Sequence, residues 1–174
     1  MQKLFWDQYP SVLVLWEATN LDANLINPFI GAITQVLPQV GVQKIDRGKI
    51  SMKEQFVESK GVTILVGMSK QVRGNIAYNM TEQAACSIAS TMMMGMAVSS
   101  FDEMAQSALS ELANMVTANA AILFSQQGLE VDISTPSMVV GHDFKAKLSS
   151  AKFIALELQV DAEILEVNIS LEKG

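Results

Sequence analysis

Apolar residues recur at intervals of three and four along two long stretches of the chain, a spacing typical of helices that bury one side. The first stretch begins at Leu21 and ends at Pro38 and Gly41. Its apolar positions are Leu25, Phe29, Ile33, Val36 and Leu37. We place Pro28 near its first turn, where a missing N–H costs little. The pattern therefore predicts one long helix early in the chain.

The second stretch starts at residues 99–102 and runs to about Gln127, just before Gly128. A shorter helix precedes it. That helix opens at Thr81, a suitable N-cap, and ends at about Met94. The chain is therefore expected to contain two long helices and one short helix.

The remaining apolar runs are short and alternate with polar residues, as strands do. We expect strands at residues 43–57, 62–66, 75–78, 129–141, 151–160 and 162–171. The second and third of these flank a turn within residues 70–74 and predict a hairpin. The fifth alternates most regularly, with Ile154, Leu156 and Leu158 on one face.

The order of these elements repeats along the chain. Asn24-Leu-Ile-Asn27 ends fourteen residues before Gly41, and Glu111-Leu-Ala-Asn114 ends fourteen residues before Gly128. Each helix then leads through its glycine into three strands. This arrangement predicts an α+β fold in which two pseudo-repeated helix-plus-three-strand halves share a largely antiparallel sheet, with the long helices packed on it.

Composition narrows the class of protein. The 174 residues are 49% apolar and 17% charged, with a formal net charge of −6, which excludes a disordered chain and disfavours nucleic-acid binding. No apolar run approaches the length of about 18 residues that a membrane-spanning helix requires. The single cysteine, Cys86, favours a cytoplasmic location. Residues 1–20 contain both tryptophans and differ from the rest, so we expect an N-terminal extension followed by one domain over 21–174.

Three polar residues of the second long helix fall on one stripe, about 130° from its apolar face. They are Ser107, Glu111 and Asn114, spaced by four and then three residues. Taken alone, the stripe is more simply explained as an ordinary solvated helix face. However, an asparagine in the middle of a helix is a mediocre helix former. A fixed carboxamide can orient a water molecule, and a neighbouring carboxylate can bind a lysine of a partner.

No metal site is expected from the residues themselves. His142 is the only histidine and has no cysteine at ligand spacing. Cys86 lies on an alanine-rich helix and reads as a small buried residue.

The pattern around the stripe resembles a known family. Ser107-x3-Glu111-x2-Asn114 is followed by Gly128 and by Ile133-Ser-Thr-Pro136-x4-Gly141, which resembles the chemotaxis phosphatases CheC and CheX. In that family Asp/Ser-x3-Glu-x2-Asn marks each active helix. Ile26-Asn-Pro-Phe29 and the strand that leads into Met80-Thr-Glu-Gln-Ala also resemble CheX. The resemblance covers about residues 21–171.

The resemblance implies a phosphatase that hydrolyses the aspartyl-phosphate of a CheY-type response regulator. Glu111 would pair with the active-site lysine of the regulator, and Asn114 would position the attacking water. Ser107 would be accessory, and Ala118, where the family usually has glycine, would leave the partner-binding surface open. The regulator would supply Mg²⁺, so the chain would need no cofactor of its own. The family also implies a homodimer.

Two further expectations concern the number of sites and the alternative function. The first half has Asn24 where the family's glutamate would stand, although Asn27 remains, so a single active site on the second long helix is expected. The alternative is a non-catalytic module on the same fold, which binds a response regulator or serves in assembly as flagellar switch proteins do.

Overall fold

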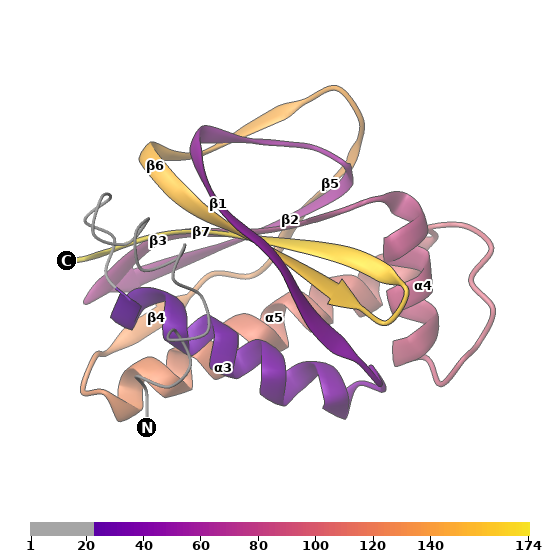
Figure 1. Ribbon diagram of the computed structural model, residues 1–174, viewed down its shortest axis with the longest axis horizontal. Helices are drawn as coiled ribbons and strands as arrows, with labels where there is room; N and C mark the ends of the chain where they lie inside the picture. Colours follow the sequence, from indigo (N-terminus) through magenta and orange to yellow (C-terminus); the bar gives the residue numbers. More distant parts are fainter. Residues whose placement is uncertain (1–22) are drawn as a thin grey trace.

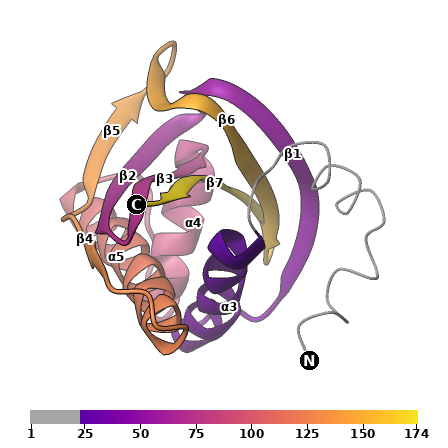
Figure 2. The ribbon, with the colours of Figure 1, turned by 90° about the vertical axis from the view of Figure 1, so that its left-hand side faces the viewer.

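The computed structural model describes residues 23–174 of the chain. Within these residues, helices α3 (Ala23–Gln39), α4 (Glu82–Met92) and α5 (Glu103–Gln126) pack on one face of a seven-stranded sheet (Figure 1). The sheet curls around the helices, so that α3 and α5 lie side by side inside its curve (Figure 2). The expected extension at residues 1–20 lies outside the described residues.

The strands of the two halves of the chain interleave in one sheet. They are β1 (Ile45–Glu58), β2 (Gly61–Lys70), β3 (Val72–Met80), β4 (Val131–Ile133), β5 (Ser137–Gly141), β6 (Lys145–Val160) and β7 (Glu163–Lys173). Their order is β1-β6-β7-β3-β2-β4, β5 also pairs with β2, and every pairing is antiparallel. Strand β1 of the first half therefore pairs with β6 of the second half, and β4 and β5 of the second half pair with β2 of the first half. The expected repeat and shared antiparallel sheet are confirmed.

Both long helices end in the same backbone motif. In α3, Gly41 donates to the Pro38 carbonyl at 3.2 Å and Val42 to the Leu37 carbonyl at 3.1 Å. The same two bonds follow α5, at 3.0 Å each, with Gly128 in the place of Gly41. Both glycines have positive φ, at 103° and 79°. This left-handed turn is the Schellman arrangement that glycine favours, so the two glycines of the repeat have one structural cause.

Helices α4 and α5 begin directly after capping residues, whereas the position of Pro28 in α3 differs from the prediction. Thr81 accepts a hydrogen bond from the Ala84 N–H at 3.1 Å, and Asp102 accepts one from the Ala105 N–H at 2.9 Å. Pro28, however, is the sixth residue of α3 and lies beyond the first turn in which we expected it. Because only the first four N–H groups of a helix lack an internal acceptor, Pro28 removes one helical bond.

The number of strand regions was predicted correctly, but the bounds of several strands were not. Residues 129–141 form two strands, since residues 134–136 separate β4 from β5 and Pro136 has no N–H to donate. Strand β6 begins at Lys145, well before the expected residue 151. The hairpin between β2 and β3 is confirmed, with a shorter turn than predicted.

The main core lies between the helices and the inner face of the sheet. Phe29 of α3 and Phe124 of α5 are fully buried and meet edge to face, with ring centroids 6.3 Å apart. The Tyr78 hydroxyl on β3 lies 2.8 Å from the Thr117 hydroxyl on α5. These contacts fix the rotation of α5 and thereby decide which of its residues face outward.

Candidate functional site

The predicted polar stripe lies on the outward side of α5. Its opposite side is buried, with Leu109, Leu112 and Val116 in the main core. Ser107 and Glu111 are exposed and Asn114 is half-buried. At 100° per residue these three side chains, with Ala118 one turn further on, fall within about 60° of the helix circumference. The structure therefore brings the expected site residues onto one surface.

A groove of about 630 Å³ runs along this stripe. It is lined from α5 by Glu103, Gln106, Ser107, Ser110, Glu111 and Asn114, and from the opposite side by Thr135, Pro136 and Met138. Ala118 lies outside the groove lining, although it shares the stripe.

The second wall of the groove is the connection between β4 and β5, and the site prediction missed it. Ser134 anchors this connection to Gly67 of β2 in both directions. Its hydroxyl accepts the Gly67 N–H at 2.8 Å, and its own N–H donates to the Gly67 carbonyl at 2.9 Å. Thr135-Pro136 interrupts an otherwise strand-like run, and this break was the available signal for a loop beside the helix.

The three stripe residues have no partner in the part of the chain that the structure describes. Among residues 23–174, the side chains of Ser107, Glu111 and Asn114 make no hydrogen bond or ion pair. Asn119, on the same helix and also half-buried, instead donates to the Met115 carbonyl at 3.1 Å. Gln106 likewise donates to the Phe101 carbonyl at 3.0 Å. The Asn114 carboxamide and the Glu111 carboxylate are therefore available to an incoming molecule.

The equivalent position in the first half has a different setting. Asn27 is the counterpart of Asn114, since each lies fourteen residues before the glycine that ends its helix. Asn27 is half-buried on α3 and precedes the buried Pro28. Asn24 takes the place of Glu111 and is exposed. The first half therefore lacks the carboxylate at this position.

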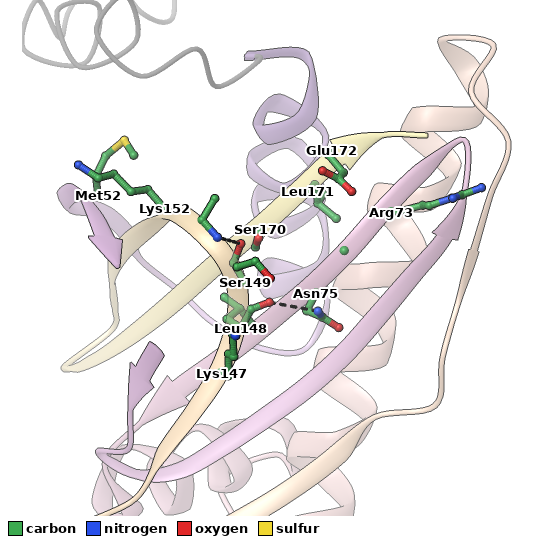
Figure 3. Close-up of a pocket in the computed structure, with 13 residues that line it drawn as sticks. Met52, Arg73, Asn75, Lys147, Leu148, Ser149, Lys152, Ser170, Leu171 and Glu172 are labelled. Atoms are coloured by element: carbon green, nitrogen blue, oxygen red, sulfur yellow. Dashed lines mark hydrogen bonds between the residues drawn. The ribbon is translucent and has the colours of Figure 1, made fainter. Parts of the chain in front are cut away.

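A larger cleft of about 830 Å³ lies on the sheet face opposite the helices (Figure 3). A bend of β6 overhangs it, and the Asn75 side chain donates to the Leu148 carbonyl at 3.1 Å. Figure 3 shows Arg73 and Lys152 on opposite sides of the cleft, and neither points toward the other. Lys152 is paired with Glu54 at 3.3 Å. The charged groups do not converge, so the cleft offers no centre for chemistry.

A carboxylate with a strongly lowered pKa also lies on that outer face. Glu166 is 1% exposed and pairs with Lys53 at 2.8 Å and Lys60 at 3.1 Å. Burial alone would raise the pKa of Glu166, but hydrogen bonds from Lys53, Asn168 and Asn79 outweigh it and lower that pKa to about 2. Because this carboxylate is enclosed and fully paired, we assign it to stability.

The part of the chain that the structure describes contains neither a cluster of metal ligands nor a helix that could span a membrane. Among residues 23–174, no three or more His, Cys, Asp or Glu side chains gather as a metal site would require. No helix in the same range combines the length and the apolar character needed to cross a bilayer.

Comparison with known proteins assigns the chain to a family. The family described as chemotaxis phosphatase CheX matches residues 62–159, more than half of the chain. The chain belongs to the CheX family. This match includes β2, β3, both helices that precede the groove wall, and most of β6.

Individual relatives agree with this assignment. The CheY-P phosphatase CheX of Thermotoga maritima is 28% identical over 155 residues, which is 88% of this chain and 99% of the relative. A CheC-like superfamily protein from Shewanella sp. PV-4 has 28% identity and a TM-score of 0.77, over 87% of this chain and 99% of that chain. The CheX–CheY–BeF3–Mg²⁺ complex from Borrelia burgdorferi has 27% identity and a TM-score of 0.74, over 86% of this chain and 98% of that chain.

Proposed function

We propose that this chain accelerates hydrolysis of the aspartyl-phosphate of a CheY-type response regulator. Membership of the CheX family supports this reaction, as does similarity to a named CheY-P phosphatase and to a CheX in complex with CheY. The observation that carries the proposal is the pair Glu111 and Asn114, which share one open groove and have no partner among residues 23–174.

Glu111 is proposed to hold the regulator in register. Its carboxylate is exposed on the stripe and makes no ion pair within the described residues 23–174. A lysine of the regulator's active site would pair with it. An exposed ion pair contributes only about 1 kcal/mol, so Glu111 serves orientation more than affinity.

Asn114 is proposed to act in the reaction itself. Its carboxamide oxygen accepts a hydrogen bond from a water and aims that water at phosphorus, in line with the aspartyl oxygen. The water oxygen bonds to phosphorus while the bond from phosphorus to the aspartyl oxygen breaks, which releases inorganic phosphate and a free carboxylate. Phosphoryl transfer depends on positioning and charge stabilisation more than on covalent help, so one well-placed amide suffices.

Mg²⁺ is assigned to the regulator in this proposal. The Borrelia burgdorferi complex contains CheY, BeF3 and Mg²⁺ together, and this supports an ion held on the regulator's side of the interface. The steps assigned to this chain use Glu111 and Asn114. Ser107 is an accessory contact, and Ala118 is a small residue at the edge of the interface. The homodimer and the cytoplasmic location stay predictions.

The direct test compares two asparagines on one helix. Asn114→Ala should reduce the acceleration of regulator dephosphorylation about 100-fold, the scale on which a lost positioning group acts. Asn119→Ala on the same helix and Asn27→Ala in the first half should each stay within about twofold of the parent chain. Equal activity of Asn114→Ala and the parent would remove Asn114 from the mechanism. A large loss in Asn27→Ala would indicate a second site.

A further inference from the structure

Charge is divided unevenly along the chain. Residues 74–144, which include α4, α5 and the second groove wall, contain seven carboxylates and no Lys or Arg. The remaining residues contain twelve cations and eleven carboxylates, so this one segment accounts for the whole negative balance. Helix α3 has no charged residue. Helices α4 and α5 contain three carboxylates, Glu82, Glu103 and Glu111, and no Lys or Arg, so the helical layer presents an acidic surface to an approaching molecule.

Within this layer the groove has a carboxylate near each end. Glu103 and Glu111 both line it and both are exposed. They are eight residues apart on α5, which is about 12 Å along a helix. Neither makes an ion pair within residues 23–174, whereas Glu130 and Asp132, outside the groove, both pair with Lys70 at 3.2 Å.

We propose that Glu103 is a second docking contact for the regulator, and that the regulator seats its basic surface in the groove between α5 and Thr135-Pro136. This inference rests on the proposed function and extends it from one contact to a surface. The two carboxylates select a partner with two cations about 12 Å apart, one that pairs with Glu111 and one that pairs with Glu103. Among residues 23–174 no Lys or Arg lines the groove, so both carboxylates are open to cations of the partner.

The second wall restricts how the partner enters. Because Ser134 fixes the connection to β2 through two hydrogen bonds, Thr135 stands opposite the stripe on a supported backbone. Thr135 is exposed and Met138 is half-buried, so the wall offers a polar rim above an apolar base. A partner that reaches Asn114 must pass this rim.

The charge test uses two glutamates in matching positions. Glu103 and Glu82 are each the first residue of a helix, each follows a capping residue and each is exposed, but only Glu103 lines the groove. The probe is Borrelia burgdorferi CheY with BeF3 and Mg²⁺, the partner in the related complex. Glu103→Gln should weaken its binding about threefold and Glu103→Lys about tenfold, with the difference shrinking as salt is added. Glu82→Gln should bind like the parent.

The wall test uses two exposed positions two residues apart. Thr135→Trp narrows the groove and should weaken binding of the same probe more than tenfold, whereas Ser137→Trp, outside the groove lining, should leave it within about twofold. Circular dichroism of all variants checks that the fold is retained.

The outcomes separate this inference from the proposed function. If the parent accelerates dephosphorylation but Glu103→Lys binds no worse than Glu82→Gln, the second contact is refuted and the phosphatase stands. If Thr135→Trp binds the probe as tightly as the parent does, the regulator does not bind in the groove. If the parent neither binds the probe nor shortens the life of its phosphorylated form, the proposed function fails and this inference fails with it.

Discussion

Two asparagines on α5 show how the environment of a side chain, rather than its type, decides its role. Asn119 donates its amide to the Met115 carbonyl and is occupied by its own helix. Asn114, five residues earlier, has no such bond within residues 23–174 and lies in the groove beside Glu111. The sequence alone could place Asn114 on the outward stripe of the helix, because the apolar face fixes the rotation of the helix.

That rotation depends on a buried hydrogen bond. Thr117 donates its only hydroxyl proton to the Ala113 carbonyl at 2.8 Å, so the Tyr78 hydroxyl must donate to Thr117. Burial raises the pKa of Tyr78 well above its ordinary value, so the hydroxyl stays protonated and can keep donating.

Thr117→Val should lower the free energy of unfolding by about 1–3 kcal/mol, because the buried Tyr78 hydroxyl loses its acceptor. Tyr78→Phe should cost less, since it removes the hydroxyl instead of leaving it unpaired. Urea denaturation of both single variants and the double variant measures the coupling. A Thr117→Val protein as stable as the parent would show that this bond does not hold the helix.

At the scale of elements, the sequence predicted the helices well and the strands unevenly. Helices were predictable because their caps and end glycines are local signals. The early part of β6 was missed because four residues, 148–151, bulge opposite Gln55 and break the alternation. Its Leu148 packs with Val57, Ala77 and Phe153 in a second small core on the outer face of the sheet. Only the folded arrangement brings these distant residues together.

The repeated glycine turns give a graded stability test. Gly128→Ala should cost about 1 kcal/mol, because an added Cβ meets open space and only the positive φ is unfavourable. Gly41→Ala should cost more, since its Cβ would also lie 3.1 Å from the Thr91 carbonyl oxygen. Thermal or urea unfolding measures both. Phosphatase activity should be unchanged in Gly128→Ala. An equal loss of unfolding free energy at the two glycines would show that crowding by Thr91 has no effect at Gly41.

At the scale of the whole molecule, the two faces of the sheet have different tasks. The helical face carries the acidic groove, and the outer face carries the enclosed Glu166 with Lys53 and Lys60. The Glu166 carboxylate on β7 contacts Lys53 of β1, Lys60 and Asn79 of β3. It therefore links the edge strand β1 to the centre of the sheet. The sequence could not foresee this cluster, because its members are separated by up to 113 residues.

The Glu166 cluster predicts the acid sensitivity of the fold. The folded pKa of Glu166, about 2, lies below its ordinary value, so the unfolded chain binds more protons between about pH 4.5 and pH 2. Stability from this group is fully present above that window and is lost as the pH falls through it, by at most about 3 kcal/mol.

Glu166→Gln should be less stable than the parent at neutral pH, since two lysines lose their carboxylate, and its unfolding free energy should fall less between pH 5 and pH 3. Urea denaturation across this range compares the two chains. Parallel pH curves would show that another carboxylate governs acid unfolding.

The central claim concerns turnover, and the lifetime of a phosphorylated CheY-type regulator with Mg²⁺ tests it most directly. The regulator is mixed with far less than one equivalent of this chain, so that each molecule of the chain must act many times. We predict that the phosphoryl group is lost faster, in proportion to the amount of chain, and that Asn114→Ala gives no such acceleration. An unchanged or prolonged lifetime, despite measurable binding, would contradict the phosphatase and identify a module that binds the regulator without hydrolysing it.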